Sequence, residues 1–555
     1  MSLVPELLLK PSAVFDTPVT TRFDWLRMEA ELLEVLRQYP DRFQPMIEPV
    51  PAREVPYASE LAAVKRFGER WRADRNFREA LPKDPVAVAR QYGLEADPMM
   101  LRSLWDIGYQ AEQPADWQPP VAVQRYRMFV REKLLHREGL RSRECVPADP
   151  RHRAWRDRQI ARTMTHLGPR SYDGIIHAPF AIEVSKGCSV GCWFCGVSAE
   201  RRQTDFLYSP ENSRLWRRML ETLKRYLGTA ATGGFAYWAT DPLDNPDYER
   251  LCLDMAEICG RFPQTTTAQP QKHVERVKRL LRLSEDHGCT INRFSVLTLK
   301  HFDKVMESFT ADELLHCEIV AQNVEASHIQ GNAGRARGSR KLKRSAEAHG
   351  FADAAWEKVP GTIACVSGWL INMVEQRVRL VTPCPASERW PDGYWVLDDR
   401  HFRDGEEFEA QLEDMMERHM TSAVRASQPA RFRRDLRISC DGETIYATGF
   451  GATTTIAGGE HVMELAKALV LGDLTAGELA VRREDLHGSP AAMTMDTLNR
   501  IFDAGAFDEE PREHGAIPAD PVPQTPELAA DAPKYPVHAL RPAYEPAVFD
   551  EEPNV

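Results

Sequence analysis

The sequence predicts an α/β protein whose centre is a partial (β/α)6 barrel, with a helical N-terminal domain and a small winged-helix-like C-terminal domain. Three observations predict this class. Residues 20 to about 165 place apolar side chains at helical three- and four-residue spacing. From residue 178, short β-branched segments alternate with amphipathic helical stretches. After residue 428, a hairpin signal precedes several short helical patterns.

Length and composition exclude several classes of protein. The 555 residues exceed one ordinary hydrophobic core, and 43% hydrophobic content is typical of a globular chain. A net charge of -11 argues against a nucleic-acid partner, because phosphate binding needs a basic surface. No apolar run is long enough to span a membrane, and the N-terminus lacks the features of a secretory signal. Eleven irregularly spaced cysteines favour a reduced, cytoplasmic protein.

The first predicted domain, residues 1–165, is helical. Residues 23–36 and 61–81 alternate apolar and charged positions with the period of a helix. Pro40 and the prolines from 49 to 56 are expected to break these helices.

The second predicted domain, residues 166–425, is the barrel. Its six strand segments are FAIEVSKG at 180, GFAYWAT at 234, QTTTAQP at 264, INRFSVLTL at 291, EIVAQNVEA at 318 and GTIACVSG at 361. Six strand–helix units suit a partial barrel better than a closed one of eight. A hairpin-like pair at 369–384 is expected to extend the sheet.

The third predicted domain, residues 426–510, is the winged-helix-like one. Asp441-Gly442 is a hairpin signal, and helical patterns follow in EHVMELAKALV, LTAGELAVRRE and MTMDTLNRIFDAGA. Pro, Ala, Asp and Glu dominate residues 511–555, which we predict to be a disordered Pro-rich tail.

The decisive motif is KGCSVGCWFCG, which places Cys188, Cys192 and Cys195 in a C-x3-C-x2-C pattern. Three thiolates on one loop can hold three corners of a [4Fe–4S] cluster and leave the fourth iron open. An open iron suits a ligand that chelates through an amine and a carboxylate, as the methionine end of S-adenosylmethionine does. A zinc site would need a fourth ligand, and a redox dithiol is the other alternative. Phe194 is expected to shield the cluster.

The motif resembles that of radical S-adenosylmethionine (SAM) enzymes. Further segments resemble the radical SAM epimerases of ribosomal peptide maturation, the proteusin-type epimerases: HAPFAIEVSKGCSVGCWFCG, YWATDPLDNPDYE, NAGRAR and CVSGWLINMVEQRVRLVTPCPASERWPDGY. The resemblance covers about 170 to 400. It implies a partial (β/α)6 barrel, an iron–sulfur cluster, SAM as cosubstrate and an isomerase that makes D-amino acid residues in a peptide.

Carried over residue by residue, the resemblance implies a set of SAM-binding positions. In the family, a Gly-Gly-Glu-Pro-like segment at the end of the second strand faces the amino group of SAM. Here Ala239-Thr240-Asp241-Pro242 stands at that place, and its polar groups can accept the hydrogens of the SAM ammonium group. An alternative stays open for the four candidates on the fourth and fifth strands, Arg293, Ser295, Gln322 and Asn323. In that alternative they are polar residues that form their hydrogen bonds within the barrel and bind no cofactor. The candidate SAM-binding residues are Phe194, Thr240, Asp241, Arg293, Ser295, Gln322 and Asn323.

Epimerisation requires a hydrogen atom to return to the peptide Cα from the face opposite to its removal by the 5′-deoxyadenosyl radical. A cysteine thiol is a suitable donor because its S–H bond is weak. Cys365, predicted on the sixth strand, and Cys384, in a Pro-constrained turn, are both candidates. The other cysteines show no C-x2-C pairing, so further clusters are not expected.

The implied partners are a ribosomal precursor peptide with a leader and an electron donor of flavodoxin or ferredoxin type. The winged-helix-like domain resembles domains that bind leader peptides by strand addition; the alternative, a generic small α/β appendage, stays open. A crosslinking or C-methylating radical SAM enzyme is the alternative function, and a nucleic-acid-binding cluster sensor is a third. The basic run from Arg335 to Arg344 is interpreted as a solvated helix face, with local anion binding left open.

Overall fold

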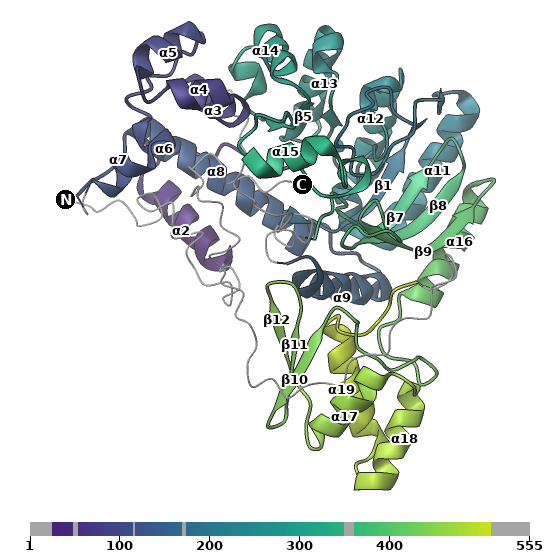
Figure 1. Ribbon diagram of the computed structural model, residues 1–555. Helices are drawn as coiled ribbons and strands as arrows, with labels where there is room; N and C mark the ends of the chain where they lie inside the picture. Colours follow the sequence, from purple (N-terminus) through teal and green to yellow (C-terminus); the bar gives the residue numbers. More distant parts are fainter. Residues whose placement is uncertain (1–24, 48–53, 115–116, 169–173, 349–359, 512–555) are drawn as a thin grey trace.

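The computed structural model describes residues 25–47, 54–114, 117–168, 174–348 and 360–511, and it shows a mixed α/β protein with several sheets (Figure 1). All but the first residue of the predicted disordered tail, 511–555, lies outside this range. No helix within these ranges is long and apolar enough to cross a membrane. The boundaries between the three predicted domains stay predictions.

The N-terminal part is helical, as its periodicity predicted, and has its own apolar core around Phe67, Trp71, Phe77 and Phe129. The buried Lys65 joins this core to the strand that begins at Cys317, because its Nζ donates to the Cys317 carbonyl at 2.8 Å. The helices are α2 (Trp25–Gln38), α3 (Ala58–Ala73), α4 (Arg75–Ala80), α5 (Pro85–Gln91), α6 (Arg102–Trp105), α7 (Ile107–Ala111), α8 (Val121–Gly139), η3 (Leu140–Glu144) and α9 (Pro150–Leu167).

Glu132 of α8 is a buried carboxyl group that makes the stability of the fold depend on pH. Its Oε2 accepts the backbone N–H groups of Met46 at 2.7 Å and Ile47 at 3.0 Å, and burial raises its pKa from 4.5 to about 7. The folded state therefore holds a proton that the unfolded state releases, and stability is lost as pH rises from about 4.5 to about 7.

Glu132→Gln is expected to remove this loss, because the amide stays neutral and keeps an acceptor oxygen. Between pH 5 and pH 8 the free energy of unfolding should fall by about 2–3 kcal/mol more in the wild type than in the variant. Urea unfolding at both pH values measures the difference. Equal pH dependence of the two proteins would show that Glu132 ionises freely in the fold.

The central sheet has the order β1-β7-β8-β9, in which β1 and β7 are parallel and the rest are antiparallel. Every residue of β1 and β7 is buried, as in a sheet covered on both faces. The β7–β8 pair confirms the predicted hairpin. The strands are β1 (Ala178–Glu183), β7 (Val366–Asn372), β8 (Arg377–Pro383) and β9 (Tyr394–His401), and α11 (Pro210–Leu227), α12 (Tyr248–Cys259) and α16 (Gly405–His419) pack in the same apolar core.

A second sheet holds three parallel strands in the order β4-β5-β6. Its strands are β4 (Thr266–Thr267), β5 (Asn292–Val296) and β6 (Cys317–Ala321), with α13 (Val274–Asp286) and α14 (Leu299–Ser308) packed against its buried face. Shorter elements are β2 (Ser185–Lys186), β3 (Thr204–Asp205), η4 (Gly228–Gly233), η5 (Pro242–Asp244), η6 (Pro270–Lys272), η7 (Asp312–Leu314), η8 (Gly334–Ala336) and α15 (Arg340–Ala348).

The prediction of a strand at 234–240 is wrong. This segment makes one isolated bridge, Phe235 to Ala181, and the parallel sheet is broken there. The backbone N–H of Ala239 donates to the Glu183 carboxylate at 2.8 Å instead of to a neighbouring strand. Glycine at 233 and 234 also weakens the strand, because it has no side chain to pack. Five of the six predicted strands form, as two parallel groups.

The C-terminal module packs on α9, which lies between it and the central sheet (Figure 1). Arg433 donates to the Thr165 hydroxyl of α9 at 2.9 Å, and Arg158 of α9 pairs with Glu509 at 2.9 Å. The hairpin expected at Asp441-Gly442 is confirmed. The module contains β10 (Arg437–Asp441), β11 (Thr444–Thr448), β12 (Thr453–Ala457), α17 (Val462–Leu471), α18 (Ala476–His487) and α19 (Ala491–Asp503).

Candidate cluster and cofactor site

The loop that follows β1 and β2 brings the thiols of Cys188, Cys192 and Cys195 together. The Cys192 and Cys195 thiols share a hydrogen bond, which lowers the pKa of Cys195 and raises that of Cys192. Burial raises the pKa of Cys188 to about 11, and the charge of Cys195 contributes to the shift. All three side chains are free thiols, so none is used in a disulfide.

The sulfur atoms of this loop also accept backbone hydrogen bonds. The Ala199 N–H donates to the Cys195 sulfur at 3.2 Å, and the Val190 N–H to the Cys188 sulfur at 3.5 Å. Hydrogen bonds of this kind stabilise thiolate ligands and tune iron–sulfur clusters. Within the described ranges, no three His, Cys, Asp or Glu side chains are grouped to hold a single metal ion. A [4Fe–4S] cube binds each thiolate to a different iron, and the donor set of this loop fits it.

Asp244 of η5 fixes the start of the cysteine loop. Its carboxylate accepts the Ser189 N–H at 2.8 Å and the Ser189 hydroxyl at 2.5 Å. Gln269, at the end of β4, donates to both Ser189 and Asp244. The loop is therefore tied to the carboxyl ends of neighbouring strand segments. Our sequence analysis singled out neither residue, although Asp244 lies in the quoted segment YWATDPLDNPDYE.

Arg335 of η8 holds the other end of the cysteine loop. Its guanidinium donates to the Cys192 carbonyl at 2.8 Å and to the Ala199 carbonyl, and its backbone N–H donates to the Cys195 carbonyl at 2.8 Å. Its positive charge contributes to the lowered pKa of Cys195 and opposes the rise in the pKa of Cys192. The sequence analysis placed Arg335 only in a basic run and in the NAGRAR segment, and missed this role.

Gly334 lies against the backbone of the cysteine loop. A Cβ added there would lie 2.5 Å from the Cys195 carbonyl oxygen and 2.4 Å from the Gly196 carbonyl carbon. Gly338 has a similar positive φ, +68° against +52°, but a Cβ there would meet nothing within 4 Å.

Gly334→Ala is expected to displace the cysteine loop and to lower the iron bound after anaerobic reconstitution by about tenfold. Gly338→Ala is the matched control, because it has the same backbone cost of about 1 kcal/mol without the collision. Iron and sulfide analysis of both variants measures the outcome. Equal iron content in the two would mean that loop packing at Gly334 does not control cluster binding.

The turn at Ala239-Thr240-Asp241-Pro242 lies near the cysteine loop, since the charge of Asp241 acts on Cys188. Asp241 is buried and accepts from the Leu243 N–H, the Thr267 hydroxyl and the Ala268 N–H at 2.8–3.0 Å. Its carboxylate thus joins the turn to the end of β4, and burial raises its pKa to about 6. The Thr240 hydroxyl is buried with no hydrogen-bond partner among the described residues. That orphaned oxygen can accept a ligand's ammonium hydrogen.

A polar face runs across β4, β5 and β6. Arg293 and Ser295 alternate with buried apolar residues on β5, and Arg293 lies opposite Thr266 of β4 and Glu318 of β6 in the register. Arg293 donates to Glu318 at 3.0 Å. Gln322 continues the half-buried row of β6, and its backbone N–H donates to the Val296 carbonyl at 2.8 Å.

Tyr237, from the segment predicted as the second strand, belongs to this polar face. Its hydroxyl contacts the Thr266 hydroxyl at 2.8 Å and donates to Gln264 at 2.7 Å. The charge of Arg293 acts on it, although burial raises its pKa to about 12. The sequence analysis did not name Tyr237, whose polar role no pattern in the chain indicates.

Asn323 and Phe194 occupy structural positions beside the site. The buried Asn323 side chain donates to the Ala73 carbonyl at 2.8 Å, which ties β6 to α3, while its Oδ1 has no partner among the described residues. Phe194 is half-buried and meets Trp193 edge-on, with ring centroids 5.6 Å apart. Both rings pack against the apolar side of α15.

The structure separates the two candidate hydrogen donors. Cys365 lies immediately before β7, not on a strand as predicted, and its carbonyl accepts the Ala178 N–H at 2.8 Å. It packs in one apolar cluster with Tyr237 and with Val197 of the cysteine loop, and Arg293 acts on its charge. Burial raises its pKa to about 12, so the thiol keeps its hydrogen at neutral pH.

Cys384 lies in different surroundings. It is 1% exposed, packs with Trp390 and Trp395, and donates to the Pro385 carbonyl at 3.5 Å. Burial raises its pKa, and the charge of Arg162 of α9 opposes the shift.

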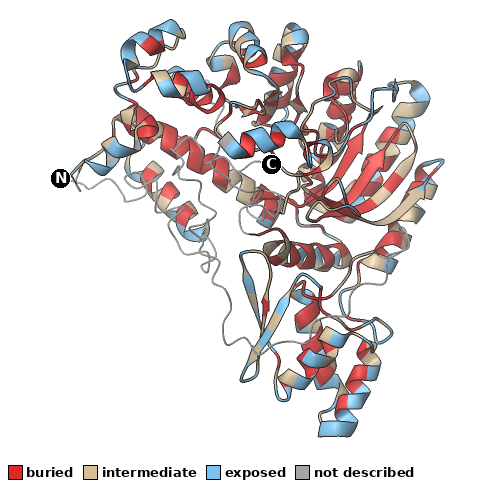
Figure 2. Cartoon of the chain, in the orientation of Figure 1, coloured by how far each residue is buried: buried red, intermediate tan, exposed pale blue. Residues whose placement is uncertain are grey.

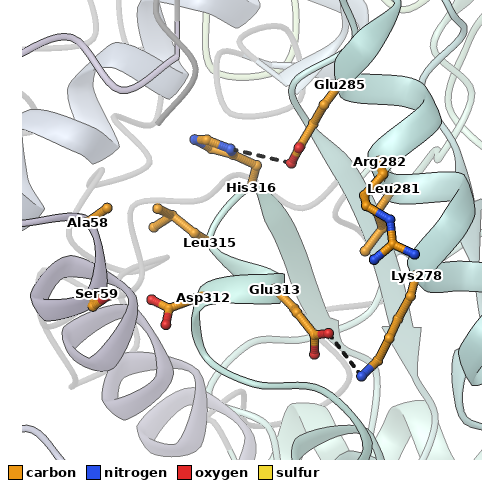
Figure 3. Close-up of a pocket in the computed structure, with 10 residues that line it drawn as sticks. All are labelled: Ala58, Ser59, Lys278, Leu281, Arg282, Glu285, Asp312, Glu313, Leu315 and His316. Atoms are coloured by element: carbon orange, nitrogen blue, oxygen red, sulfur yellow. Dashed lines mark ion pairs between the residues drawn. The ribbon is translucent and has the colours of Figure 1, made fainter. Parts of the chain in front are cut away.

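A cavity of about 340 Å³ lies elsewhere, between α3, α13 and the chain that leads into β6 (Figure 3). His316 and Glu285 face each other across it at 4.0 Å, and Lys278 pairs with Glu313 at 2.9 Å. It opens near the amino end of β6, whereas the cysteine loop follows the carboxyl end of β1. None of the predicted site residues lines it.

Comparison with known proteins gives few matches. No protein-family model matches the chain. The solved structure of BtrN in complex with AdoMet and 2-DOIA is 14% identical, over 36% of this chain and 71% of that chain, with a TM-score of 0.24. A likeness this slight carries no conclusion. The uncharacterized protein y4wI of Sinorhizobium fredii is 37% identical over 458 residues, which are 81% of this chain and 88% of that protein. The chain therefore belongs to the same protein family as y4wI.

Proposed function

We propose that the chain is a radical SAM epimerase, which converts L-amino acid residues of a ribosomally made precursor peptide to D-residues. One observation carries the proposal. A C-x3-C-x2-C loop gathers its thiols after a parallel strand, and a separate, protonated thiol, Cys365, packs in the same apolar cluster as the end of that loop. The first group of thiols fits a cluster, and the second fits a hydrogen-atom donor.

The residues that would hold the cofactors are those at the carboxyl ends of the strand segments. Cys188, Cys192 and Cys195 would ligate three irons, and no other cysteine lies between residues 145 and 252 to close the fourth position. Thr240 would accept from the SAM amino group through its unpartnered hydroxyl. Arg293 and Ser295 line the polar face along which the rest of SAM would lie.

When bound, the cluster and SAM would supply a 5′-deoxyadenosyl radical that removes the Cα hydrogen of a peptide residue. Cys365 would then give its thiol hydrogen to the opposite face of that carbon. One electron from the reductant and one proton would convert the sulfur radical left on Cys365 back to a thiol. Cys365 is half-buried, and its apolar surroundings raise its pKa, so the thiol stays protonated at neutral pH. Arg293, paired with Glu318, and Tyr237 would position the peptide backbone through hydrogen bonds.

We also propose that the C-terminal module binds the leader of the precursor peptide by strand addition. Its sheet has the order β10-β11-β12, and among the described residues no strand pairs with the outer edge of β10 or β12. An unpaired strand edge offers a row of backbone N–H and C=O groups to an extended peptide. The close packing of this module on α9 would keep a bound leader at a fixed distance from the site.

The test is an anaerobic reaction in heavy water with the precursor peptide encoded beside the gene, with dithionite as reductant. Epimerisation should add one deuterium at each inverted Cα, because the donor thiol exchanges with solvent. In ordinary water the peptide should change chirality without changing mass. Mass spectrometry measures the added deuterium in heavy water and the unchanged mass in ordinary water. Chiral amino acid analysis after hydrolysis measures the inversion. A loss of two hydrogens would indicate crosslinking, and a gain of a methyl group would indicate C-methylation.

A further inference from the structure

An exposed basic surface lies beside the cysteine loop. The sequence from 335 to 344 contains six cations and no acid, and it leads into and forms the first half of α15. All six side chains are exposed, and Figure 2 shows α15 with a largely exposed outer side. We call this surface the basic α15 face; it consists of Arg335, Arg337, Arg340, Lys341, Lys343 and Arg344.

Most of these charges are not neutralised within the part of the chain that the structure describes. No ion pair there involves any of the six, whereas the exposed arginines Arg75 of α4 and Arg418 of α16 pair with Glu79 and Asp414. The chain as a whole carries a net charge of -11. A concentrated positive field on an acidic protein directs an acidic partner to that one face, because the remaining surface repels it.

The opposite side of α15 contacts the cysteine loop directly. Leu342 and Ala346 are buried against Trp193 and Phe194, the two aromatic residues between Cys192 and Cys195. The ammonium of Lys341 lies 5.6 Å from the Trp193 ring centroid. A protein docked on the basic α15 face would therefore be separated from the cluster ligands only by this helix and these two rings.

We infer that the basic α15 face is the docking surface for an acidic one-electron donor protein that carries a flavin or an iron–sulfur centre. The inference rests on the proposed function, which requires such a reductant. One electron would leave the reduced centre of the donor, which is thereby oxidised by one electron, and would enter the oxidised cluster held by the loop. No bond forms or breaks in this step. Complexes of this kind are small and held largely by charge, so one short helix and the turn before it suffice.

The test variant reverses three exposed charges that do not touch the cysteine loop: Arg340→Glu, Lys343→Glu and Arg344→Glu. The matched control reverses three exposed arginines on α11 and α13 that form no ion pair with any described residue: Arg214→Glu, Arg279→Glu and Arg282→Glu. Both proteins change the net charge by the same amount. A neutral set, Arg340→Gln, Lys343→Gln and Arg344→Gln, is included because glutamine keeps the helix propensity and avoids new repulsion.

Binding of an oxidised flavodoxin to each full-length protein is measured by biolayer interferometry at 50 mM and 200 mM NaCl. Charge reversal should raise Kd at least about tenfold at low salt and flatten its salt dependence. The glutamine set should show a smaller rise, and the control less than about threefold. No measurable binding to the wild type, or equal weakening in test and control proteins, would overturn the inference. Polyglutamate binding is measured in the same way. If the charge-reversal variant loses polyglutamate binding but keeps flavodoxin binding, the inference is also overturned, since that result would indicate an acidic peptide as the occupant.

A second readout separates this inference from the proposed function. Formation of 5′-deoxyadenosine is measured with dithionite and, separately, with reduced flavodoxin. The charge-reversal variant should match the wild type with dithionite and lose most of its flavodoxin-driven rate. If the wild type forms no product even with dithionite, the proposed function fails instead.

Discussion

Replacing any one of Cys188, Cys192 and Cys195 by alanine is expected to abolish the formation of 5′-deoxyadenosine from SAM. Each thiol would hold one corner of the cluster, and the loop offers no substitute ligand, because no other cysteine lies between residues 145 and 252. Even residues that only support metal ligands change affinity or activity by 10–100-fold when mutated. The loss of a ligand should therefore exceed about 100-fold. Chromatography of dithionite reactions measures the product, and iron analysis measures the cluster.

A matched control for this prediction is Cys440→Ala, which removes a half-buried thiol from β10 of the C-terminal module. This variant should keep both its iron and its SAM cleavage. Melting temperatures of the cluster-free proteins show whether the three loop variants still fold. If a folded Cys192→Ala protein retains a four-iron cluster and cleaves SAM, the thiols do not have the role proposed here.

The sequence alone allowed the cysteine loop and most of the elements around it to be predicted. The strands at 291 and 318 alternate apolar residues cleanly, and β5 and β6 form there. The hairpin at Asp441-Gly442 and the helices that follow it also form, because turn chemistry and helical periodicity are local properties. Helix α11 begins at Pro210 for an equally local reason, because the Ser209 side chain caps it by accepting the Asn212 N–H.

The sequence could not predict which backbone groups find partners outside the sheet. The segment at 234–240 has strand-like composition, but the Glu183 carboxylate takes the Ala239 N–H, and the sheet is interrupted. The sixth strand begins five residues later than its predicted start at 361, so Cys365 precedes β7. Both differences arise from long-range contacts that no local pattern encodes.

Two of the residues missed at the site, Arg335 and Asp244, act on the loop through its backbone groups. Arg335 binds two carbonyls of the cysteine loop, and Asp244 binds the N–H of Ser189. A side chain that binds backbone leaves no signature in the sequence of its partner. Asp241 shows the converse. It looked like a ligand for SAM, but its carboxylate accepts from the Thr267 hydroxyl and the Ala268 N–H at the end of β4, and from the Leu243 N–H of its own turn. Thr240, with its unpartnered hydroxyl, is the stronger candidate of the two.

Cys365→Ala is expected to abolish peptide epimerisation while SAM cleavage continues. The thiol lies among Tyr237, Val197 and the polar face of Arg293, so its removal takes away the hydrogen that must return to Cα. The cluster loop does not depend on it, because no hydrogen bond from the Cys365 side chain to that loop is present in the structure described. D-residue formation should fall by at least about 100-fold, as expected for loss of a group that acts directly in the reaction. Chiral analysis of the peptide and chromatography of 5′-deoxyadenosine measure the two outcomes in one reaction.

The paired variant Cys384→Ala decides between the two thiols that the sequence left open. Cys384 is packed between Trp390 and Trp395 in a separate cluster, so its truncation should cost about 1 kcal/mol of stability and leave epimerisation intact. The contrast depends on burial: a donor must reach the substrate, and Cys384 is 1% exposed with its hydrogen directed at the Pro385 carbonyl. If Cys365→Ala still epimerises the peptide and Cys384→Ala does not, then Cys384 is the hydrogen donor and Cys365 is not. Retention in both would place the donor on another residue.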